Sequence, residues 1–248
     1  MGHYRKDLED AAIKHVFEMN EEFSDEIKYS IENSKIFRYT PAIQEDGPTE
    51  YFNFQPTTTT VAIMDMVCKY GKNIAALNYA SYKWAGGGFI KGSMAQEEAL
   101  CHDSTLYNVI GNIKFEHEYK LNRNDLHKSM YTNFAIFSPD VVFVDDEDWY
   151  KVNVLTCPAP NYKAGKENGV SYKDNLKCLK ERAEFMIKVA KANNTEVLIL
   201  GAWGCGVFGQ NEHDLAIIFK DILNRYKFKE VLFAIPDNAK LNEFKKVF

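Results

Sequence analysis

The sequence predicts an α/β fold: a sheet flanked by helices on both faces, preceded by an N-terminal helical segment. Short apolar runs alternate with helical patterns from about residue 57 onward. The runs are almost continuously apolar, which is typical of strands in a sheet covered by helices on both sides. Residues 4–35 instead carry apolar side chains at helical spacing. We therefore expect a helical extension over residues 1–50, packed on one α/β domain over residues 51–248.

Local patterns place the individual elements. Three prolines within residues 36–58 predict an extended connection, and residues 57–70 predict a short strand leading into a helix. Further strands are predicted at residues 73–80, 131–138, 141–146, 152–160, 196–201 and 230–236. Helices are predicted at residues 95–110, 175–194 and 213–226. The mixed charges of residues 114–128 predict an exposed loop or insertion.

The overall charge argues against a protein that holds duplex nucleic acid. The chain has 30 basic and 35 acidic residues and a net charge of -5, whereas a surface that binds phosphate backbones needs a basic excess. We therefore expect no sequence-specific DNA binding. A small anionic ligand stays possible, because backbone dipoles can bind one locally.

The cysteines and histidines show no metal or disulfide pattern. Five cysteines are odd in number and widely spaced, which indicates a reducing compartment. The six histidines lack ligand spacing, and the acidic run at residues 145–148 is better explained as a solvated turn between strands than as a cation site. No stretch is typical of a signal peptide or a membrane span. We expect a soluble cytoplasmic monomer without metal or cofactor.

The most informative motif joins a glycine run to a pair of carboxylates. Gly86-Gly87-Gly88 lets backbone N–H groups approach a ligand closely, and Gln96-Glu97-Glu98 follows it on a predicted helix. Adjacent like charges in a partly enclosed site favour keeping one proton, so one of these glutamates can act as an acid near neutral pH. The motif predicts a ligand cradle beside an acid/base.

A second glycine segment, Gly201 to Gly209, lies between a predicted strand and a predicted helix. Gly204, Gly206 and Gly209 spell G-x-G-x-x-G, the dinucleotide-binding fingerprint, and Asp237 follows the next strand. The spacing to Asp237 is longer than usual, and the strand–helix units of a dinucleotide fold do not follow. The pattern still predicts a phosphate site, because backbone N–H groups before a helix can hold a diphosphate.

Cys101-His102 invites comparison with thiol proteases. Consecutive residues on a helix do not face each other, and such dyads are usually assembled from distant segments. We therefore set this alternative aside. Cys205 is interpreted as a small residue in a tight turn.

Together the motifs resemble the signature of microbial-type poly(ADP-ribose) glycohydrolases, which are built on a macrodomain. The matching segments, over about residues 55–248, are Asn78-Tyr79-Ala80-Ser81, Gly86-Gly87-Gly88, Gln96-Glu97-Glu98, Ser104-Thr105-Leu106-Tyr107, Ser138-Pro139, Pro158-Ala159-Pro160-Asn161 and Gly201 to Gly209. The chain departs from the pattern at Lys83-Trp84-Ala85, where family members commonly have a proline before the first glycine. This departure can alter the rim of the site without touching its chemistry.

The resemblance implies roles for particular residues. Glu98 matches the catalytic glutamate, which protonates the leaving oxygen of the glycosidic bond and then activates water; Glu97 matches the residue that holds the distal ribose. Asn78 and Phe208 match groups that contact the same ribose, although Asn78 could instead cap a turn and Phe208 could instead fill the core. The remaining expected binding residues are Gly86, Gly87, Gly88 and Gln96 around the ribose, and Gly204, Cys205, Gly206, Val207 and Gly209 at the diphosphate.

The implied substrate is poly(ADP-ribose), cleaved at chain ends with release of ADP-ribose as part of ADP-ribosylation reversal and the DNA damage response. Two alternatives stay open: hydrolysis of single ADP-ribose units on protein or nucleic acid, and ADP-ribose binding without catalysis. The paired glutamates favour an enzyme, because a binding module has no need of two carboxylates at the scissile bond. Pro158 to Asn161 is a reasonable wall for an adenine pocket, which the sequence otherwise leaves unassigned.

Overall fold

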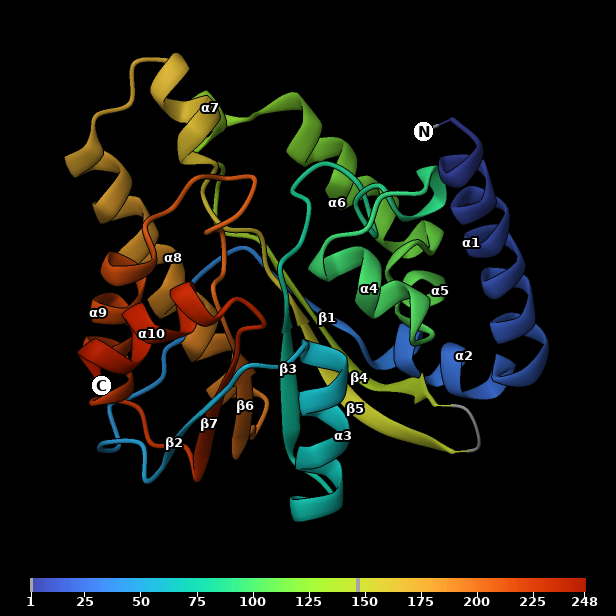
Figure 1. Ribbon diagram of the computed structural model, residues 1–248, viewed down its shortest axis with the longest axis horizontal. Coiled ribbons are helices and arrows are strands. Elements are labelled where there is room, and N and C mark those ends of the chain that lie inside the picture. The colour runs from blue at the N-terminus through green and yellow to red at the C-terminus, as the bar shows by residue number, and fades with distance from the viewer. Residues whose placement is uncertain (1, 146–147) are drawn as a thin grey trace.

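A seven-stranded mixed sheet forms the centre of the molecule in a computed structural model that describes residues 2–145 and 148–248 (Figure 1). The strands are β1 (Lys35–Phe37), β2 (Phe52–Gln55), β3 (Ile74–Asn78), β4 (Ala135–Val144), β5 (Trp149–Thr156), β6 (Val197–Leu200) and β7 (Glu230–Ala234). Their order across the sheet is β1-β4-β5-β3-β6-β7-β2. Pairs from β5 to β2 are parallel, whereas β4 runs antiparallel to both β5 and β1.

Helices cover both faces of this sheet, as predicted. One face carries α8, α9 and α10, and the other carries α1 to α5 (Figure 1). Their bounds are α1 (Gly2–Glu22), α2 (Ser24–Asn33), α3 (Thr59–Tyr70), α4 (Gln96–His102), α5 (Leu106–Ile110), α6 (Ile113–Asn124), α7 (Tyr162–Glu167), α8 (Tyr172–Ala192), α9 (Glu212–Leu223) and α10 (Asn238–Val247). Two short 3-10 helices, η1 (Phe89–Lys91) and η2 (His127–Ser129), complete the set.

Strand β3 shows why an almost continuously apolar run is required. Ala75 and Leu77 belong to the core under α8 and α9, whereas Ile74 and Ala76 belong to the core under α3. Successive side chains of a strand point to opposite faces, so both faces must be apolar when both are covered. Every residue of β3 is buried. Its last residue, Asn78, brings a polar group to the carboxyl end of this central strand.

The prediction was wrong for residues 57–70, which form no strand. Thr58 caps α3 by accepting a hydrogen bond from the N–H of Val61, so the run of threonines starts a helix. The parallel edge strand β2 lies instead inside residues 36–58, where a connection was expected. The runs at residues 131–138 and 141–146 correspond to one strand, β4, with a register shift between Ser138 and Val141. Part of the acidic run at residues 145–148 lies outside the described residues.

Residues 114–128 were also predicted wrongly, because most of them belong to helix α6. Phe115, Tyr119 and Asn122 are buried on one face of this helix, at the spacing of an amphipathic helix. The surrounding charged residues obscured that spacing in the sequence. Arg38 contributes to the packing by donating from Nε to Glu118 at 2.6 Å.

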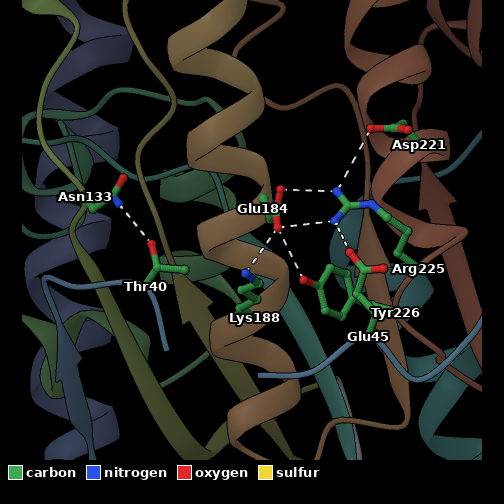
Figure 2. Close-up of polar contacts among 8 residues, drawn as sticks. All are labelled: Thr40, Glu45, Asn133, Glu184, Lys188, Asp221, Arg225 and Tyr226. Atoms are coloured by element: carbon green, nitrogen blue, oxygen red, sulfur yellow. Dashed lines mark hydrogen bonds and ion pairs between the residues drawn. The ribbon is translucent and has the colours of Figure 1, made fainter. Parts of the chain in front are cut away.

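A charged network ties the long connection before β2 to α8 and to the segment that follows α9. Glu184 on α8 accepts from Arg225, and Arg225 also reaches Glu45 in the connection (Figure 2). The division of the chain at residue 50 stays a prediction; β1, which precedes that point, pairs with β4 in the same sheet. Within the described residues, no helix is long and apolar enough to cross a membrane.

Candidate active site

The glutamate pair lies in the first turn of α4, facing the glycine loop. Glu98 accepts hydrogen bonds from two backbone N–H groups: that of Gly88 at 2.8 Å to Oε1 and that of Ala95 at 3.0 Å to Oε2. The second bond runs from the main chain of the N-cap residue Ala95 to the third residue of the helix, and the alanine side chain offers no reciprocal acceptor. Both carboxylate oxygens are therefore held by the main chain, which fixes the position of this group.

Glu97 is held differently and is buried without a cation. Its Oε2 accepts from the N–H of Ser81 at 2.7 Å, and its Oε1 accepts from Nδ2 of Asn78 at 3.2 Å. Burial, aided by the negative charge of Glu98, raises the pKa of Glu97 to about 8 despite the hydrogen bonds from Ser81 and Asn78, which lower it. Among the described residues neither glutamate forms an ion pair. The prediction that one member of the pair keeps a proton near neutral pH therefore applies to Glu97.

Gly87 lets both carboxyl groups approach the loop. Its φ is +60°, and a Cβ at this position would lie 2.6 Å from Oε1 of Glu98 and 2.9 Å from Oε2 of Glu97. Any larger residue would displace the pair and strain the backbone. The two carboxyl groups thus converge on one backbone position, and Gly86 and Gly88 continue the close approach against Tyr107 and Ser93.

Gln96 joins the strand to the helix. Its Nε2 donates to the carbonyl of Leu77 at 2.8 Å and to Thr59 at 3.1 Å, while its Oε1 accepts from the N–H of Tyr79 at 2.8 Å. Both ends of the amide are therefore paired with protein groups. This residue positions α4 against the end of β3, so it orients the glutamates that follow it.

The second glycine segment forms the loop between β6 and α9. Cys205 is buried, and burial raises the pKa of its thiol to about 12; its carbonyl accepts from Nζ of Lys240 at 2.8 Å. Gly206 faces open space, and Val207 is 77% exposed. Phe208 is half-buried and packs edge-on against Tyr131. The loop therefore presents its main chain toward solvent at Gly206.

Both loops line one cavity of about 590 Å³. Its walls include Gly87, Gly88, Gln96, Glu97, Glu98, Gly204, Gly206, Val207 and Phe208. A second cavity of about 470 Å³ adjoins it, since Tyr79, Gln96 and Lys240 line both. The far end of the second cavity is formed by Thr58 to Thr60, Pro236 and Asp237.

Asn78 lies behind the cavity wall rather than on it. Its Nδ2 donates to Glu97 and to Oγ1 of Thr156, both at 3.2 Å, and its buried Oδ1 has no partner among the described protein atoms. The amide thus supports Glu97 and caps no turn with its side chain. Thr156 is its partner because the parallel register pairs the ends of β3 and β5.

Several residues at the cavity were not singled out as binding groups by the sequence. Trp84 and Lys91 line the first cavity beside the glutamates, and Lys240 on α10 lies between the two cavities. In the sequence, Trp84 stands out only as part of a departure from the family pattern. No sequence signal links Lys240 to the site, because it approaches from the last helix. Ala159, in the segment expected to form an adenine wall, lines the first cavity next to Gly204.

The other sequence candidates show no reactive geometry. Cys101 is fully buried, and burial raises the pKa of its thiol, while burial lowers the pKa of the neighbouring His102. Neither a thiolate nor an imidazolium is therefore favoured there. All five cysteines are free. In residues 2–145 and 148–248, no group of three or more His, Cys, Asp or Glu side chains is placed to hold a metal ion.

Comparison with known proteins agrees with this geometry. Residues 10–146 match the family described as "Microbial-type PARG, catalytic domain", where PARG denotes poly(ADP-ribose) glycohydrolase. A comparison with curated protein sequences gives no match.

Two solved structures are similar over nearly the whole chain. The poly(ADP-ribose) glycohydrolase from Thermomonospora curvata has a TM-score of 0.86 and 26% identity, covering 98% of this chain and 100% of that one. The T267R mutant of the Deinococcus radiodurans enzyme, in complex with ADP-ribose, has a TM-score of 0.77 and 30% identity, covering 89% and 96%. The predicted macrodomain-like α/β fold is confirmed. The chain therefore belongs to the microbial-type poly(ADP-ribose) glycohydrolases, a family of glycoside hydrolases.

Proposed function

We propose that this chain releases ADP-ribose from the ends of poly(ADP-ribose) chains, with Glu98 as the general acid/base and Glu97 as the group that holds the distal ribose. The observation that carries the proposal is the carboxyl pair on the wall of a cavity that also contains the open glycine loop. A glycosidic bond to ribose breaks through an oxocarbenium-like state, so protonation of the leaving oxygen is the step that most needs a side chain.

The proton that this step needs comes from the pair. With a pKa raised to about 8, Glu97 is mostly protonated at neutral pH. Its partner Asn78 can serve either state, because rotating the amide by 180° exchanges Nδ2 for the unpartnered Oδ1. Both carboxyl groups converge on Gly87, so a proton can pass between them as substrate binds. Glu98 then delivers it to the leaving oxygen and afterwards takes one from the attacking water.

The diphosphate of the substrate is proposed to lie at the loop from Gly204 to Gly209. A Cβ at Gly206 would meet no protein atom within 4 Å, so a phosphate can approach the main chain of the loop there. Lys240 lines both cavities and supplies a cation at their junction, although Glu212 also pairs with it at 3.1 Å. Phosphate held at this place would lie near the positive charge that develops on the distal ribose and would help to stabilise it.

We place the adenosine of the terminal unit in the second cavity. The two cavities are contiguous, and their shared walls lie between the glutamates and the far end at Pro236. A ligand with an adenosine at one end and a ribose at the other, joined by a diphosphate, fits that arrangement when the distal ribose meets Glu97. This placement replaces the adenine wall expected at Pro158 to Asn161, since Ala159 lines the first cavity only.

The test is release of ADP-ribose from purified poly(ADP-ribose), measured together with binding of free ADP-ribose. We expect release by the wild type, and loss of release with retained ADP-ribose affinity for Glu98→Gln. A wild type that binds ADP-ribose without releasing any would support the binding-module alternative. A fully active Glu98→Gln would remove Glu98 from the mechanism.

Acceptor choice is proposed to favour the polymer over single ADP-ribose units on protein or nucleic acid. Parallel assays on poly(ADP-ribose), mono-ADP-ribosylated protein and ADP-ribosylated DNA compare these acceptors directly. The free cysteines fit action in a reducing compartment such as the cytoplasm. A monomeric state and a part in the DNA damage response stay predictions, to be tested by light scattering and by survival of a deletion strain after DNA damage.

A further inference from the structure

We propose that Trp84, with Lys83 and Lys91 around it, binds the leaving side of the substrate: the adenine and phosphates of the second-to-last ADP-ribose unit. The inference rests on the proposed function and extends it beyond the terminal unit. It assigns a role to the Lys83-Trp84-Ala85 departure and to helix α6, which the catalytic proposal does not use.

Trp84 is an exposed aromatic held in a fixed place. It is 52% exposed, its N–H donates to Oγ of Ser81 at 3.2 Å, and its carbonyl accepts from the N–H of Gly87 at 3.1 Å. The turn that carries the indole therefore ends at the glycine that faces both catalytic carboxyl groups. An aromatic ring on a rigid turn offers contact area at low entropic cost.

Helix α6 supports the Trp84 ring through its residue Arg123. Arg123 places its guanidinium carbon 4.3 Å from the centre of the Trp84 ring and donates from its NH1 nitrogen to the carbonyl of Lys83 at 3.0 Å. Asn122 donates to the carbonyl of Tyr82 at 2.9 Å. Arg123 and Asn122 therefore hold the main chain of residues 82–83, which precede the glycine run. The segment 113–124 thus orients the rim of the cavity, and a cation stacked on an indole is a stabilising contact.

The position of Trp84 matches the leaving side. Trp84, Lys91 and Glu98 line the first cavity and are absent from the walls of the second. With the terminal adenosine in the second cavity and its distal ribose at the glutamates, the proposal puts Trp84 in the part of the first cavity that the adenosine does not occupy. The group on the other side of the scissile bond must leave in that direction.

The chemistry of the polymer places a purine there. The bond that breaks joins the distal ribose to O2′ of the preceding adenosine, and the adenine of that adenosine is attached to the adjacent carbon, C1′. An adenine therefore lies beside the leaving oxygen in every internal linkage. Base stacking on an exposed aromatic is the usual way for proteins to hold an unpaired base.

Positive charge near Trp84 suits the phosphates of the same unit. The ammonium of Lys91 lies 5.9 Å from the centre of the indole ring, and Lys83 is exposed next to it in the chain. In the described part of the chain neither ammonium forms an ion pair. Arg123 forms an ion pair with Glu116 at 2.5 Å, which neutralises its charge. Lys83 and Lys91 are therefore the cations beside Trp84 that we expect to pair with a diphosphate.

The test compares ADP-ribose with a two-unit ADP-ribose oligomer by calorimetry, using Glu98→Gln to prevent cleavage. We expect the oligomer to bind about tenfold more tightly than ADP-ribose, the low end of the range for one stacked base. Adding Trp84→Ala should remove most of this difference in affinity and leave the ADP-ribose affinity unchanged, and Trp84→Phe should keep most of the difference. The double variant Lys83→Gln/Lys91→Gln should lower oligomer affinity about threefold and reduce its salt dependence.

Trp149 provides the matched control, because it is equally exposed at 52% and lies at the start of β5, away from the cavities; Trp149→Ala should change neither affinity. Equal affinities of oligomer and ADP-ribose would overturn the inference, as would equal losses for both ligands in Trp84→Ala, which would indicate a structural wall. If Trp84→Ala weakened an ADP-ribosylated peptide but not the oligomer, the surface would serve a protein acceptor instead. Failure of wild-type release from the polymer refutes the proposed function separately, since the binding comparison needs no catalysis.

Discussion

Glu184 on α8 and Glu97 on α4 are carboxyl groups in opposite surroundings. Glu184 is bonded by Arg225, Lys188 and Tyr226 (Figure 2), and the hydrogen bond from Arg225 is the largest of the effects that lower its pKa to about 2. Glu97 has only uncharged donors, and burial raises its pKa to about 8. The first group is a fixed charge that stabilises the fold; the second can gain or lose a proton on the wall of the cavity where the substrate is proposed to bind.

The largest expected effect is on activity, which should depend on Glu98 but not on Glu184. We expect Glu98→Gln to lower the rate of ADP-ribose release by about 10³-fold, the scale of a general acid. Glu184→Gln should leave that rate within about twofold, since neither Glu184 nor its partners Arg225, Lys188 and Tyr226 line either cavity. Steady-state release from poly(ADP-ribose) measures both. Equal losses would mean that the charged network, and not only the glutamate pair, supports catalysis.

Gly87→Ala should displace the carboxyl groups of Glu97 and Glu98 without altering either residue, so it tests whether their position is critical for activity. We expect about a 10²-fold loss of release, because the new Cβ would meet both carboxyl groups and small displacements of catalytic groups are costly. Gly169→Ala is the control: its φ is +79° with nothing within 4 Å, so it carries the backbone strain alone. A similar loss of activity in both variants would assign the effect to strain rather than to the carboxylates.

The sequence was sufficient to predict the elements that repeat a pattern. The almost continuously apolar β3 and the amphipathic α8 follow from their residues, and the motif around Glu98 pointed to a glutamate pair that the structure places against the glycine loop. Helix α6 was missed because its buried Phe115, Tyr119 and Asn122 stand among charges. The place of Asn78 depends on the register of β3 against β5, which no local pattern encodes.

Contacts between segments far apart in the chain could not be predicted either, because no local pattern encodes them. Lys240 meets the carbonyl of Cys205 across 35 positions of sequence, and Arg123 reaches Trp84 from another element. Such pairs arise when the topology brings elements together. The sequence therefore pointed to the glutamate pair and the two glycine loops, which line one cavity, whereas the surrounding cations and the rim required the fold. The acid/base role of Glu98 stays a prediction.

The pH dependence of stability should have opposite signs in the two regions. For Glu97 the folded pKa of about 8 lies above the ordinary value of 4.5, so the folded state keeps a proton that the unfolded state has lost, and stability falls as pH rises between these values. Glu97→Gln removes this titration. Its stability relative to wild type should improve by about 2 kcal/mol between about pH 6 and about pH 7.5, from 1.4 kcal/mol per pH unit. Urea unfolding at both pH values measures it, and a constant difference would contradict a raised pKa at Glu97.

Glu184→Gln should show the smaller and reversed effect. The folded pKa of Glu184, about 2, lies below the ordinary value of 4.5, so its stabilisation is complete above about pH 4.5 and is lost as pH falls toward 2. The side chain is 27% exposed, so we expect a loss of only about 1 kcal/mol at neutral pH. Urea unfolding of the variant and wild type at neutral pH and near pH 2.5 should show that difference shrinking. Glu18→Gln, in an exposed pair with Lys14 on α1, should cost less than about 0.5 kcal/mol at either pH. If the Glu184 difference persisted at low pH, its contribution would come from packing rather than from charge, and the contrast with Glu97 would no longer be one of proton affinity.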